Sequence, residues 1–368
     1  MSVMQSAPGP RTIIDNKEYD YFAGCGYLGF QGCKELIDAA CDAVRLYGLG
    51  SSTSRKGCGD NPALLEVETR AAQFFEKEAA LYYASGYMGN LILLQGLSEE
   101  YDCIFTDSSS HYSVLDAASA ADKPVFQFAH LEADDLKKQL TEHVKPNQRP
   151  LVISDGVFPI SGTVSPIRDY LDVLTSYDNF IVCTDDAHAV GVIGEKGQGC
   201  YEYHNLSHPS LFSSATLSKA FGGYGGIIAC TAEWREKLIN NARVCFASSS
   251  PPTPAAGASA KALEILYAHP EIRTKLWDNA AHAKQGLADL GFEIDETPVP
   301  IISLSSDTAD IKTLPEKLKS RGIIVSRFYT GGDDYSSVPE GGCVRVAVFA
   351  DHSREQIDTL IQAIGEVI

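Results

Sequence analysis

The chain has 368 residues, a hydrophobic fraction of 44% and a charged fraction of 21%, values typical of a soluble globular protein. Its formal net charge of −18 disfavours nucleic acid or an anionic membrane as the main partner, because either would repel it. No apolar run reaches the ~18 residues of a membrane-spanning helix, and the N-terminus lacks a signal-peptide core. A chain of this length is expected to form one large domain and a smaller one.

Ten cysteines are present, but a long chain rich in apolar residues does not need a disulfide framework. Cys103, Cys183 and Cys230 fall inside apolar strand patterns, where cysteine acts as a small buried hydrophobe. The sequence contains no Cys-x-x-Cys pair and no histidine spacing typical of zinc, so no metal site is expected. We expect a reducing, cytoplasmic location.

The N-terminal part of the chain predicts a hairpin, a helix and a loop. Turn-forming residues between apolar stretches favour a hairpin over residues 11–22. The spacing of apolar residues predicts a helix over 34–47. Residues 48–62 are too rich in glycine and serine for regular structure. Pro62 then suits the first turn of another helix.

From residue 80 onward, short apolar segments alternate with amphipathic helical patterns, notably 113–121, 134–141 and 167–175. Continuous apolar strands separated by helices predict an α/β fold with a mostly parallel sheet covered on both faces. Ligands of such sheets bind beyond the carboxyl ends of the strands. The expected strands are 80–84, 103–106, 124–128, 151–154, 180–184, 211–215 and 226–230.

The pattern changes after Pro251 and Pro252. A helical region over 254–287 is expected to bridge to a smaller α+β domain, and a last helix is expected over 354–364. We therefore divide the chain into an N-terminal segment, a large domain and a small C-terminal domain, with bounds 1–47, 48–253 and 254–368. The strands expected in the small domain are 301–304, 323–327 and 344–348.

Two of the strands in the large domain end in residues that can carry chemistry. One leads into Asp185, Asp186 and His188, in the run DDAHAVGVIGEKGQG. The other leads into Lys219, in the run TLSKAFGGYGG. A pyridoxal 5′-phosphate (PLP) enzyme needs a lysine for the Schiff base and a carboxylate for the protonated pyridine nitrogen. The two runs therefore predict PLP as the cofactor, although an isolated SKxxGG is more often a surface lysine before a flexible turn.

The order of these runs resembles the α-oxoamine synthase group of fold-type I PLP enzymes, in which 8-amino-7-oxononanoate synthase, 2-amino-3-ketobutyrate CoA ligase and serine palmitoyltransferase are found. The resemblance extends from about Arg11 to the C-terminus. It implies a large domain with a mostly parallel seven-stranded sheet and a small C-terminal α+β domain. It also implies that the N-terminal segment packs with the small domain.

The resemblance assigns cofactor roles to single residues. Strand alternation sends Asp185 and Asp186 to opposite faces, and the group's pattern places Asp185 at the pyridine nitrogen. His188 is expected to hydrogen-bond the phenolic oxygen of PLP, with a structural histidine as the alternative. His111 is expected to stack on the pyridine ring and to assist proton transfer, although alone it reads as a helix-start residue. Lys219 is the expected catalytic lysine.

The phosphate of PLP needs backbone N–H donors at the start of a helix. The run ASGYMGN follows an apolar strand, so we assign this role to Gly86, Tyr87 and Met88, and Thr216 can add a hydroxyl. The resemblance implies that Ser249 and Ser250 reach the phosphate from the partner subunit, which would make the active unit a homodimer. Simple loop polarity is the alternative for these serines.

Arg345 lies within an apolar strand pattern, where a buried arginine needs a partner. The resemblance implies that it binds the α-carboxylate of an amino-acid substrate, for which a planar fork is suited. An exposed salt bridge at a strand edge is the alternative.

The match breaks at positions expected to face the substrates. Gly26 stands where the group usually has Asn before Tyr-Leu-Gly, and Leu64 stands where it has His ahead of a Leu-Glu pair. Asp155 and Pro159 replace the Glu and Ser of a Glu-Gly-Val-Phe-Ser run. Residues 327–342 replace a Pro-Thr-Val-Pro run that helps to form the acyl-donor pocket. These departures leave open which acyl donor is used and whether it is linked to CoA.

The resemblance implies an acyltransferase that condenses an amino acid with an acyl thioester of CoA or an acyl-carrier protein. Loss of carbon dioxide would leave an α-aminoketone, and Lys219 is the expected proton carrier. An aminotransferase or aldolase on the same fold is the alternative that Gly26 and Pro159 motivate. A non-catalytic scaffold subunit is a third reading, which the presence of Lys219 and Asp185 disfavours.

Overall fold

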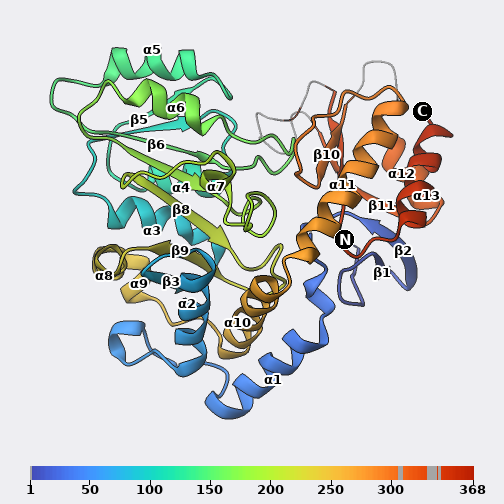
Figure 1. Cartoon of the computed structure of the whole chain (residues 1–368), viewed down its shortest axis with the longest axis horizontal. Coiled ribbons are helices and arrows are strands. Elements are labelled where there is room, and N and C mark those ends of the chain that lie inside the picture. The colour runs from blue at the N-terminus through green and yellow to red at the C-terminus, as the bar shows by residue number, and fades with distance from the viewer. Residues whose placement is uncertain (1, 306–309, 330–337, 339–340) are drawn as a thin grey trace.

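The computed structural model describes residues 2–305, 310–329, 338 and 341–368, and its regular elements form two sheets with their helices (Figure 1). The larger sheet has the strand order β3-β9-β8-β7-β6-β4-β5. All strands expected in this region are confirmed to within about two residues at each end. Their bounds are β3 (Ala79–Tyr83), β4 (Cys103–Asp107), β5 (Val125–Phe128), β6 (Pro150–Asp155), β7 (Ile181–Asp185), β8 (Leu211–Thr216) and β9 (Gly226–Cys230).

The parallel direction of the central strands brings the residues at their carboxyl ends together. Strands β4 to β8 pair in parallel, and β9 pairs antiparallel with both β8 and β3. The sheet is therefore mostly parallel, as the sequence predicts. Asp155 and Asp185 are Cα partners at the carboxyl ends of β6 and β7, so their side chains begin side by side.

Helices cover both faces of the large sheet, so side chains that point to either face of its strands are buried. Ile104 and Ile153 pack in a core with α3 and α4, whereas Phe105 and Val152 pack in another core with α5 and α6. The helices of this region are α2 (Pro62–Phe74), α3 (Gly89–Gly96), α4 (Tyr112–Ser119), α5 (Ala133–His143), α6 (Ile167–Leu174), α7 (Cys200–Tyr203), α8 (Ala232–Asn241) and α9 (Arg243–Ala247).

The smaller sheet combines both ends of the chain, at the right of Figure 1. The expected N-terminal hairpin is present, and its second strand pairs in parallel with β11. The N-terminal strand β2 therefore lies beside the C-terminal strand β11 in one sheet. The strand order is β1-β2-β11-β12-β10, with bounds β1 (Arg11–Ile14), β2 (Lys17–Phe22), β10 (Ile301–Leu304), β11 (Ile323–Phe328) and β12 (Cys343–Ala347).

The helical region predicted over 254–287 consists of two helices rather than one. His269 has φ −129° and ψ 65°, which is not helical, because the following Pro270 disfavours the helical conformation of the residue before it. The division of the chain at residues 47 and 253 stays a prediction. The remaining helices are α1 (Lys34–Tyr47), α10 (Thr253–Ala268), α11 (Glu271–Asp289), α12 (Leu314–Ser320) and α13 (Arg354–Gly365).

Two absences concern only the described part of the chain. None of its helices combines the length and the apolar character needed to span a membrane. All ten cysteines lie in this part, and each has a free thiol.

Candidate active site at the strand ends

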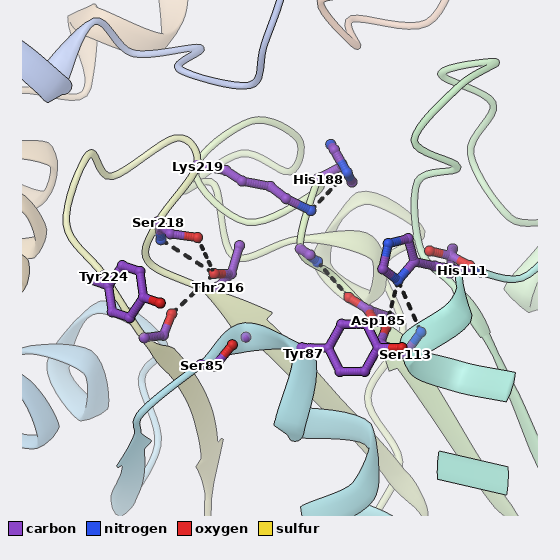
Figure 2. A pocket seen from close by; sticks show the side chains of 14 residues that line it. Ser85, Tyr87, His111, Ser113, Asp185, His188, Thr216, Ser218, Lys219 and Tyr224 are labelled. Carbon is purple, nitrogen blue, oxygen red and sulfur yellow. Dashed lines mark hydrogen bonds between the residues drawn. The ribbon is translucent and has the colours of Figure 1, made fainter. Parts of the chain in front are cut away.

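A cavity of about 220 Å³ lies beyond the carboxyl ends of β6, β7 and β8 (Figure 2). This is where ligands of parallel sheets bind. Most of the predicted site residues line it, although they come from separate parts of the chain. These residues are Gly86, Tyr87, His111, Asp185, His188, Thr216 and Lys219.

Lys219 follows β8 and its side chain points toward His188, as Figure 2 shows. Its Nζ lies 2.8 Å from Nε2 of His188, and its carbonyl accepts a 2.6 Å hydrogen bond from Nε2 of Gln31. Burial lowers the pKa of Lys219, whereas the charges of Asp185 and Asp155 oppose that shift. The lysine is thus fixed at its backbone, and burial shifts it toward its neutral, nucleophilic form.

Asp185 is a buried carboxylate held by three donors. Its Oδ2 accepts hydrogen bonds from Nδ2 of Asn90 at 2.7 Å and from Oγ of Ser113 at 3.0 Å. Its Oδ1 accepts the N–H of Ala187 at 3.1 Å. These three donors fix the orientation of the carboxylate, so Asp185 is placed to pair with a protonated nitrogen in the cavity.

Asp186 points away from the cavity, as strand alternation predicts. Its Oδ2 accepts the N–H of Cys200 at 3.1 Å, and burial raises its pKa to about 7. A Cβ at Gly156 would lie 2.0 Å from Asp186 Oδ1, which shows how tightly this carboxyl is packed. Asp185 is therefore the one of the two adjacent carboxylates that faces the cavity.

His111 starts α4 and lines the cavity beside Asp155. Its backbone N–H donates to Oδ2 of Asp155 at 2.7 Å, and its Nδ1 accepts the N–H of Ser113 at 3.1 Å. Burial lowers the pKa of His111, which favours a neutral ring. Burial, followed by the charge of Asp185, raises the pKa of Asp155 well above its usual range. Asp155 and Asp185 share one wall of the cavity, and Asp155 is shifted toward its neutral form.

The turn after β3 carries Gly86, one of the residues for which the sequence predicts phosphate binding. A Cβ at Gly86 would lie 2.6 Å from Cβ and Oγ1 of Thr216, so only glycine allows this approach. Thr216 Oγ1 in turn lies 2.8 Å from Oγ of Ser218. Gly86 and Tyr87 line the cavity, whereas Met88, Ser249 and Ser250 line a separate small cavity.

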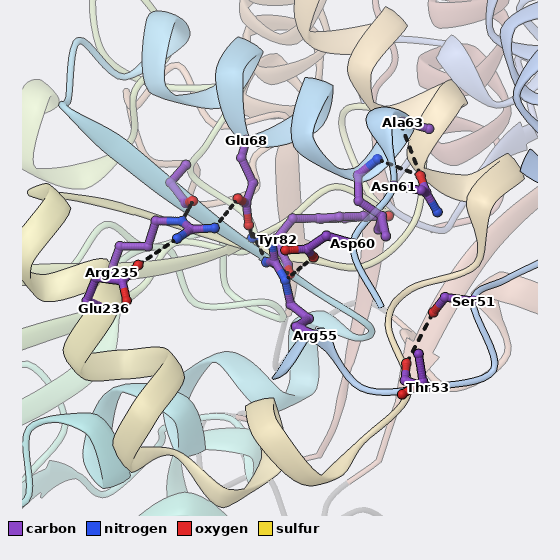
Figure 3. A network of polar contacts seen from close by, with 12 residues as sticks. Ser51, Thr53, Arg55, Asp60, Asn61, Ala63, Glu68, Tyr82, Arg235 and Glu236 are labelled. Carbon is purple, nitrogen blue, oxygen red and sulfur yellow. Dashed lines mark hydrogen bonds and ion pairs between the residues drawn. The ribbon is translucent and has the colours of Figure 1, made fainter. Parts of the chain in front are cut away.

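The glycine-rich loop is held by buried ion pairs (Figure 3). Arg55 in the loop contacts Glu68 of α2, and only 8% of either side chain is exposed. Glu68 also accepts the N–H of Tyr82 at 2.9 Å and pairs with Nη2 of Arg235 at 2.7 Å. The network joins the loop to α2, β3 and α8, which keeps it ordered beside the small cavity.

Arg345 is buried in the middle of the small sheet, since β12 lies between β10 and β11. The alternative of an exposed salt bridge at a strand edge is therefore wrong. Its Nη1 donates to the carbonyl of Pro159 at 2.7 Å, and its Nη2 donates to the carbonyl of Gly24 at 2.9 Å. Its Nε is buried and has no hydrogen-bond partner among the residues that the structure describes. A buried guanidinium with a spare donor is suited to receive a carboxylate.

The structure explains two of the departures from the group's pattern. A Cβ at Gly26 would lie 2.6 Å from Oε1 of Gln31, whose amide holds the carbonyl of Lys219. Pro159, which stands where the group has serine, contributes its backbone carbonyl to Arg345. Leu64 lies in the apolar core, only 2% exposed, and does not line the cavity. Of the segment 327–342, residues 330–337, 339 and 340 lie outside the described residues.

The residues around the cavity fit PLP. Lys219 supplies an amine, Asp185 supplies a charged carboxylate, and Gly86 leaves room that any side chain would fill. His188 is also present, with a neutral ring because burial lowers its pKa well below the usual range. This donor set matches the needs of a cofactor with an aldehyde, a pyridine nitrogen and a phosphate.

Comparison with known proteins supports this assignment. The pattern of the family described as "Aminotransferase class I and II" matches residues 26–364. The chain belongs to that family. It is 32% identical to the 8-amino-7-oxononanoate synthase of Thermoanaerobacter pseudethanolicus, covering 100% of this chain and 92% of that protein. It is also 32% identical to 8-amino-7-oxononanoate synthase 2 of Bacillus subtilis, covering 99% and 92%.

Solved structures of the same group share the fold. The serine palmitoyltransferase of Sphingomonas wittichii is 25% identical, with a TM-score of 0.91 over 100% of this chain and 91% of that one. A high-resolution structure of SPT with PLP has the same TM-score and identity, and the match covers 100% of this chain and 92% of that one. Within its family the chain is therefore a member of the α-oxoamine synthase group, which are PLP-dependent acyltransferases.

Several residues around the cavity were not singled out from the sequence. Asn90 and Ser113 hold Asp185, and Tyr27 contacts His188 at 2.7 Å. A signal for Asn90 exists, since it is a polar residue at the start of the apolar helix GNLILLQG. Tyr27 carries no such signal, because its partner is 161 positions away. Ser85 and Tyr224 also line the cavity.

Proposed function

We propose that this protein condenses an amino acid with an acyl thioester, with loss of carbon dioxide, to give an α-aminoketone. The observation that carries the proposal is the convergence of Lys219, His188 and Asp185 in one cavity, with Arg345 buried nearby. Membership of the α-oxoamine synthase group supports the same reaction. Bound PLP supplies an electron sink that makes the α-carbon of the amino acid nucleophilic.

Each residue of the chain then has a defined task. Arg345 binds the α-carboxylate through the guanidinium donors that the carbonyls leave free. Asp185 keeps a proton on the facing nitrogen through its carboxylate, which three donors hold in place. Lys219, released by the incoming amine, removes the α-proton, because burial favours its neutral form. His111 flanks the same space and limits the tilt of a bound ring.

The acyl donor is proposed to be a thioester of CoA or of an acyl-carrier protein. We also propose that the protein acts in the cytoplasm and as a homodimer. In that dimer Ser249 and Ser250 would reach the phosphate of the partner's cofactor. Their position supports this, since within one chain they line a cavity other than the one at Lys219.

The test is a panel assay with the purified protein and PLP. Single amino acids are combined with acyl-CoA and acyl-carrier-protein thioesters, and released thiol and carbon dioxide are measured. The proposal expects one pairing to release both in equal amounts, with all turnover lost in Lys219→Ala. Release of neither product with any pairing would overturn it.

The same assay separates the aminotransferase and aldolase alternatives. Conversion of bound PLP to its amine form by an amino acid alone would indicate an aminotransferase. Aldehyde release from a β-hydroxy amino acid would indicate an aldolase. Neither of these two reactions releases thiol from an acyl thioester, so each of the three reactions has its own signal.

A further inference from the structure

A buried chain of hydrogen bonds runs from the N-terminal segment to the catalytic lysine. The hydroxyl of Tyr27 lies 2.7 Å from Nδ1 of His188, and Nε2 of the same ring lies 2.8 Å from Nζ of Lys219. Tyr27 is 0% exposed and His188 is 4% exposed. Water therefore does not substitute for these contacts, and a proton placed on one atom constrains the others.

The position of Tyr27 is fixed by its own backbone. Its carbonyl accepts the N–H of Ala350 at 2.8 Å, which ties this part of the chain to the segment after β12. Four residues later, Gln31 holds the carbonyl of Lys219. The N-terminal segment is thus linked to Lys219 in two ways. Gln31 bonds directly to the backbone carbonyl of the lysine, and Tyr27 reaches its side chain through His188.

The protonation states decide which atom donates. Burial raises the pKa of Tyr27 well above its usual range, so the hydroxyl keeps its proton. Burial, followed by the positive charge of Lys219, lowers the pKa of His188, so the ring is neutral and carries one proton. A neutral imidazole has one donor and one acceptor nitrogen. The Cys25 thiol also lies close to the Tyr27 hydroxyl, but sulfur is a weak acceptor.

We infer that Tyr27 is a positioning residue that donates its phenolic proton to Nδ1 of His188 and so holds the ring proton on Nε2, facing Lys219. An Nε2–H group can bond only to an amine with a free lone pair. The opposite tautomer would instead accept a hydrogen bond from a charged ammonium. Tyr27 therefore shifts the balance at Lys219 toward the neutral amine that attacks a carbonyl.

Other titratable or charged groups also face this chain of three residues. They act equally in the wild-type protein and in a variant that changes only the Tyr27 hydroxyl, so the comparison below cancels their effect. They are Tyr21, Cys25, His111, Asp155, Asp185 and Arg345.

The first test is Tyr27→Phe in the full-length protein before PLP is added. Reductive methylation of Lys219 by formaldehyde and a borane, followed by peptide mass spectrometry, gives the pH midpoint of its reactivity. We expect the midpoint to rise by about one pH unit, because the tautomer that stabilises the ammonium is no longer disfavoured. Tyr101→Phe is the matched control, since it removes a buried hydroxyl that donates to the carbonyl of Leu94 at 2.9 Å.

The second test reads the tautomer in the wild-type protein, so that result stands even if Tyr27→Phe folds poorly. Nitrogen-15 NMR of labelled histidines reads the tautomer directly, and His188→Asn identifies the resonance. We expect Nε2 protonated and Nδ1 unprotonated in the wild type, and both tautomers in Tyr27→Phe. A protonated Nδ1 in the wild type, or an unchanged methylation midpoint in Tyr27→Phe, would overturn the inference.

This inference rests on the proposed role of Lys219 as the group that binds PLP. Neither test uses an amino acid or an acyl donor. A failed condensation assay would therefore leave both results intact, and a failed tautomer test would leave the condensation assay intact.

Discussion

Asp185, His188 and Lys219 line the cavity at the ends of neighbouring strands of one parallel sheet, whereas Arg345 lies on a strand of the other sheet and does not line the cavity. The first three are fixed by side chains and by strand ends. Arg345 is fixed by the carbonyls of Gly24 and Pro159, which lie in two loops. The residues proposed to bind the cofactor are thus held mainly by side-chain contacts, whereas the arginine proposed to bind the amino acid is held mainly by backbone carbonyls.

This difference explains where the sequence departs from its group. A backbone carbonyl is offered by any residue, so Pro159 can replace a serine without releasing Arg345. A strand-end carboxylate offers no such freedom, because its side chain itself makes the contact. Substitutions on the cofactor side should therefore be severe, and those on the amino-acid side should change affinity more than turnover.

The largest effect is expected for Asp185→Asn. Loss of the charge facing the pyridine nitrogen should lower kcat by ~100- to 1,000-fold, as removal of one electrostatic stabiliser does. Steady-state kinetics of the condensation, with the visible absorption band of bound PLP, gives the measurement. Asp186→Asn is the control, because it changes an adjacent carboxylate that faces away from the cavity. Equal losses in both variants would contradict the assignment of Asp185.

The residues at the ends of the parallel strands were easier to predict from the sequence than the residues that reach the site from other parts of the chain. Asp185, His188 and Lys219 were predictable, because parallel strands bring their carboxyl ends to one edge. Tyr27 was not, because its contact with His188 depends on how the N-terminal segment docks between two sheets. The break between α10 and α11 was missed although Pro270 marks it, since the apolar spacing continues through it.

A smaller effect is expected for Arg345→Lys. Lysine keeps the charge but loses the planar fork, so the KM of the amino acid should rise by ~10- to 100-fold while kcat changes less. Initial rates over a range of amino-acid concentrations separate the two constants. Arg327→Lys is the matched control, because Arg327 lies on the neighbouring strand β11 and pairs with Glu316 at 3.0 Å. An unchanged KM in Arg345→Lys would place the carboxylate elsewhere.

A still smaller kinetic effect is expected for Gly26→Asn, which restores the residue usual in the group. The new side chain collides with Gln31 and so disturbs the backbone anchor of Lys219. We expect a loss of about 1–3 kcal/mol in the free energy of unfolding from this overpacking. The loss of kcat should stay below about tenfold, because the lysine moves only slightly.

Thermal unfolding and turnover are measured together in this variant. Gly9→Asn is the control, since nothing lies within 4 Å of a Cβ at Gly9. A gain in turnover would mean that asparagine acts here as it does in the group, and that Gln31 is free to move.

The last effect concerns the attachment of the N-terminal segment and appears only below neutral pH. His352 is 1% exposed, stacks on Phe22 with ring centroids 4.0 Å apart and contacts the carbonyl of Tyr21 at 3.1 Å. Its Nδ1 accepts the N–H of Phe349 at 2.8 Å, so the ring is neutral. Burial lowers its pKa to about 4.

The sign of the pH dependence follows from that shift. The unfolded chain binds a proton at His352 near its ordinary pKa, well above the value in the folded protein, so stability is present at pH 7 and is lost as the pH falls toward 4. The contribution amounts to at most about 3 kcal/mol. His352→Asn keeps an acceptor for the N–H of Phe349 and should flatten the dependence of unfolding free energy on pH between 7 and 4. His208→Asn, at an exposed position, is the control. If His352→Asn leaves that slope unchanged, other groups carry the acid sensitivity and the N-terminal segment is held without this ring.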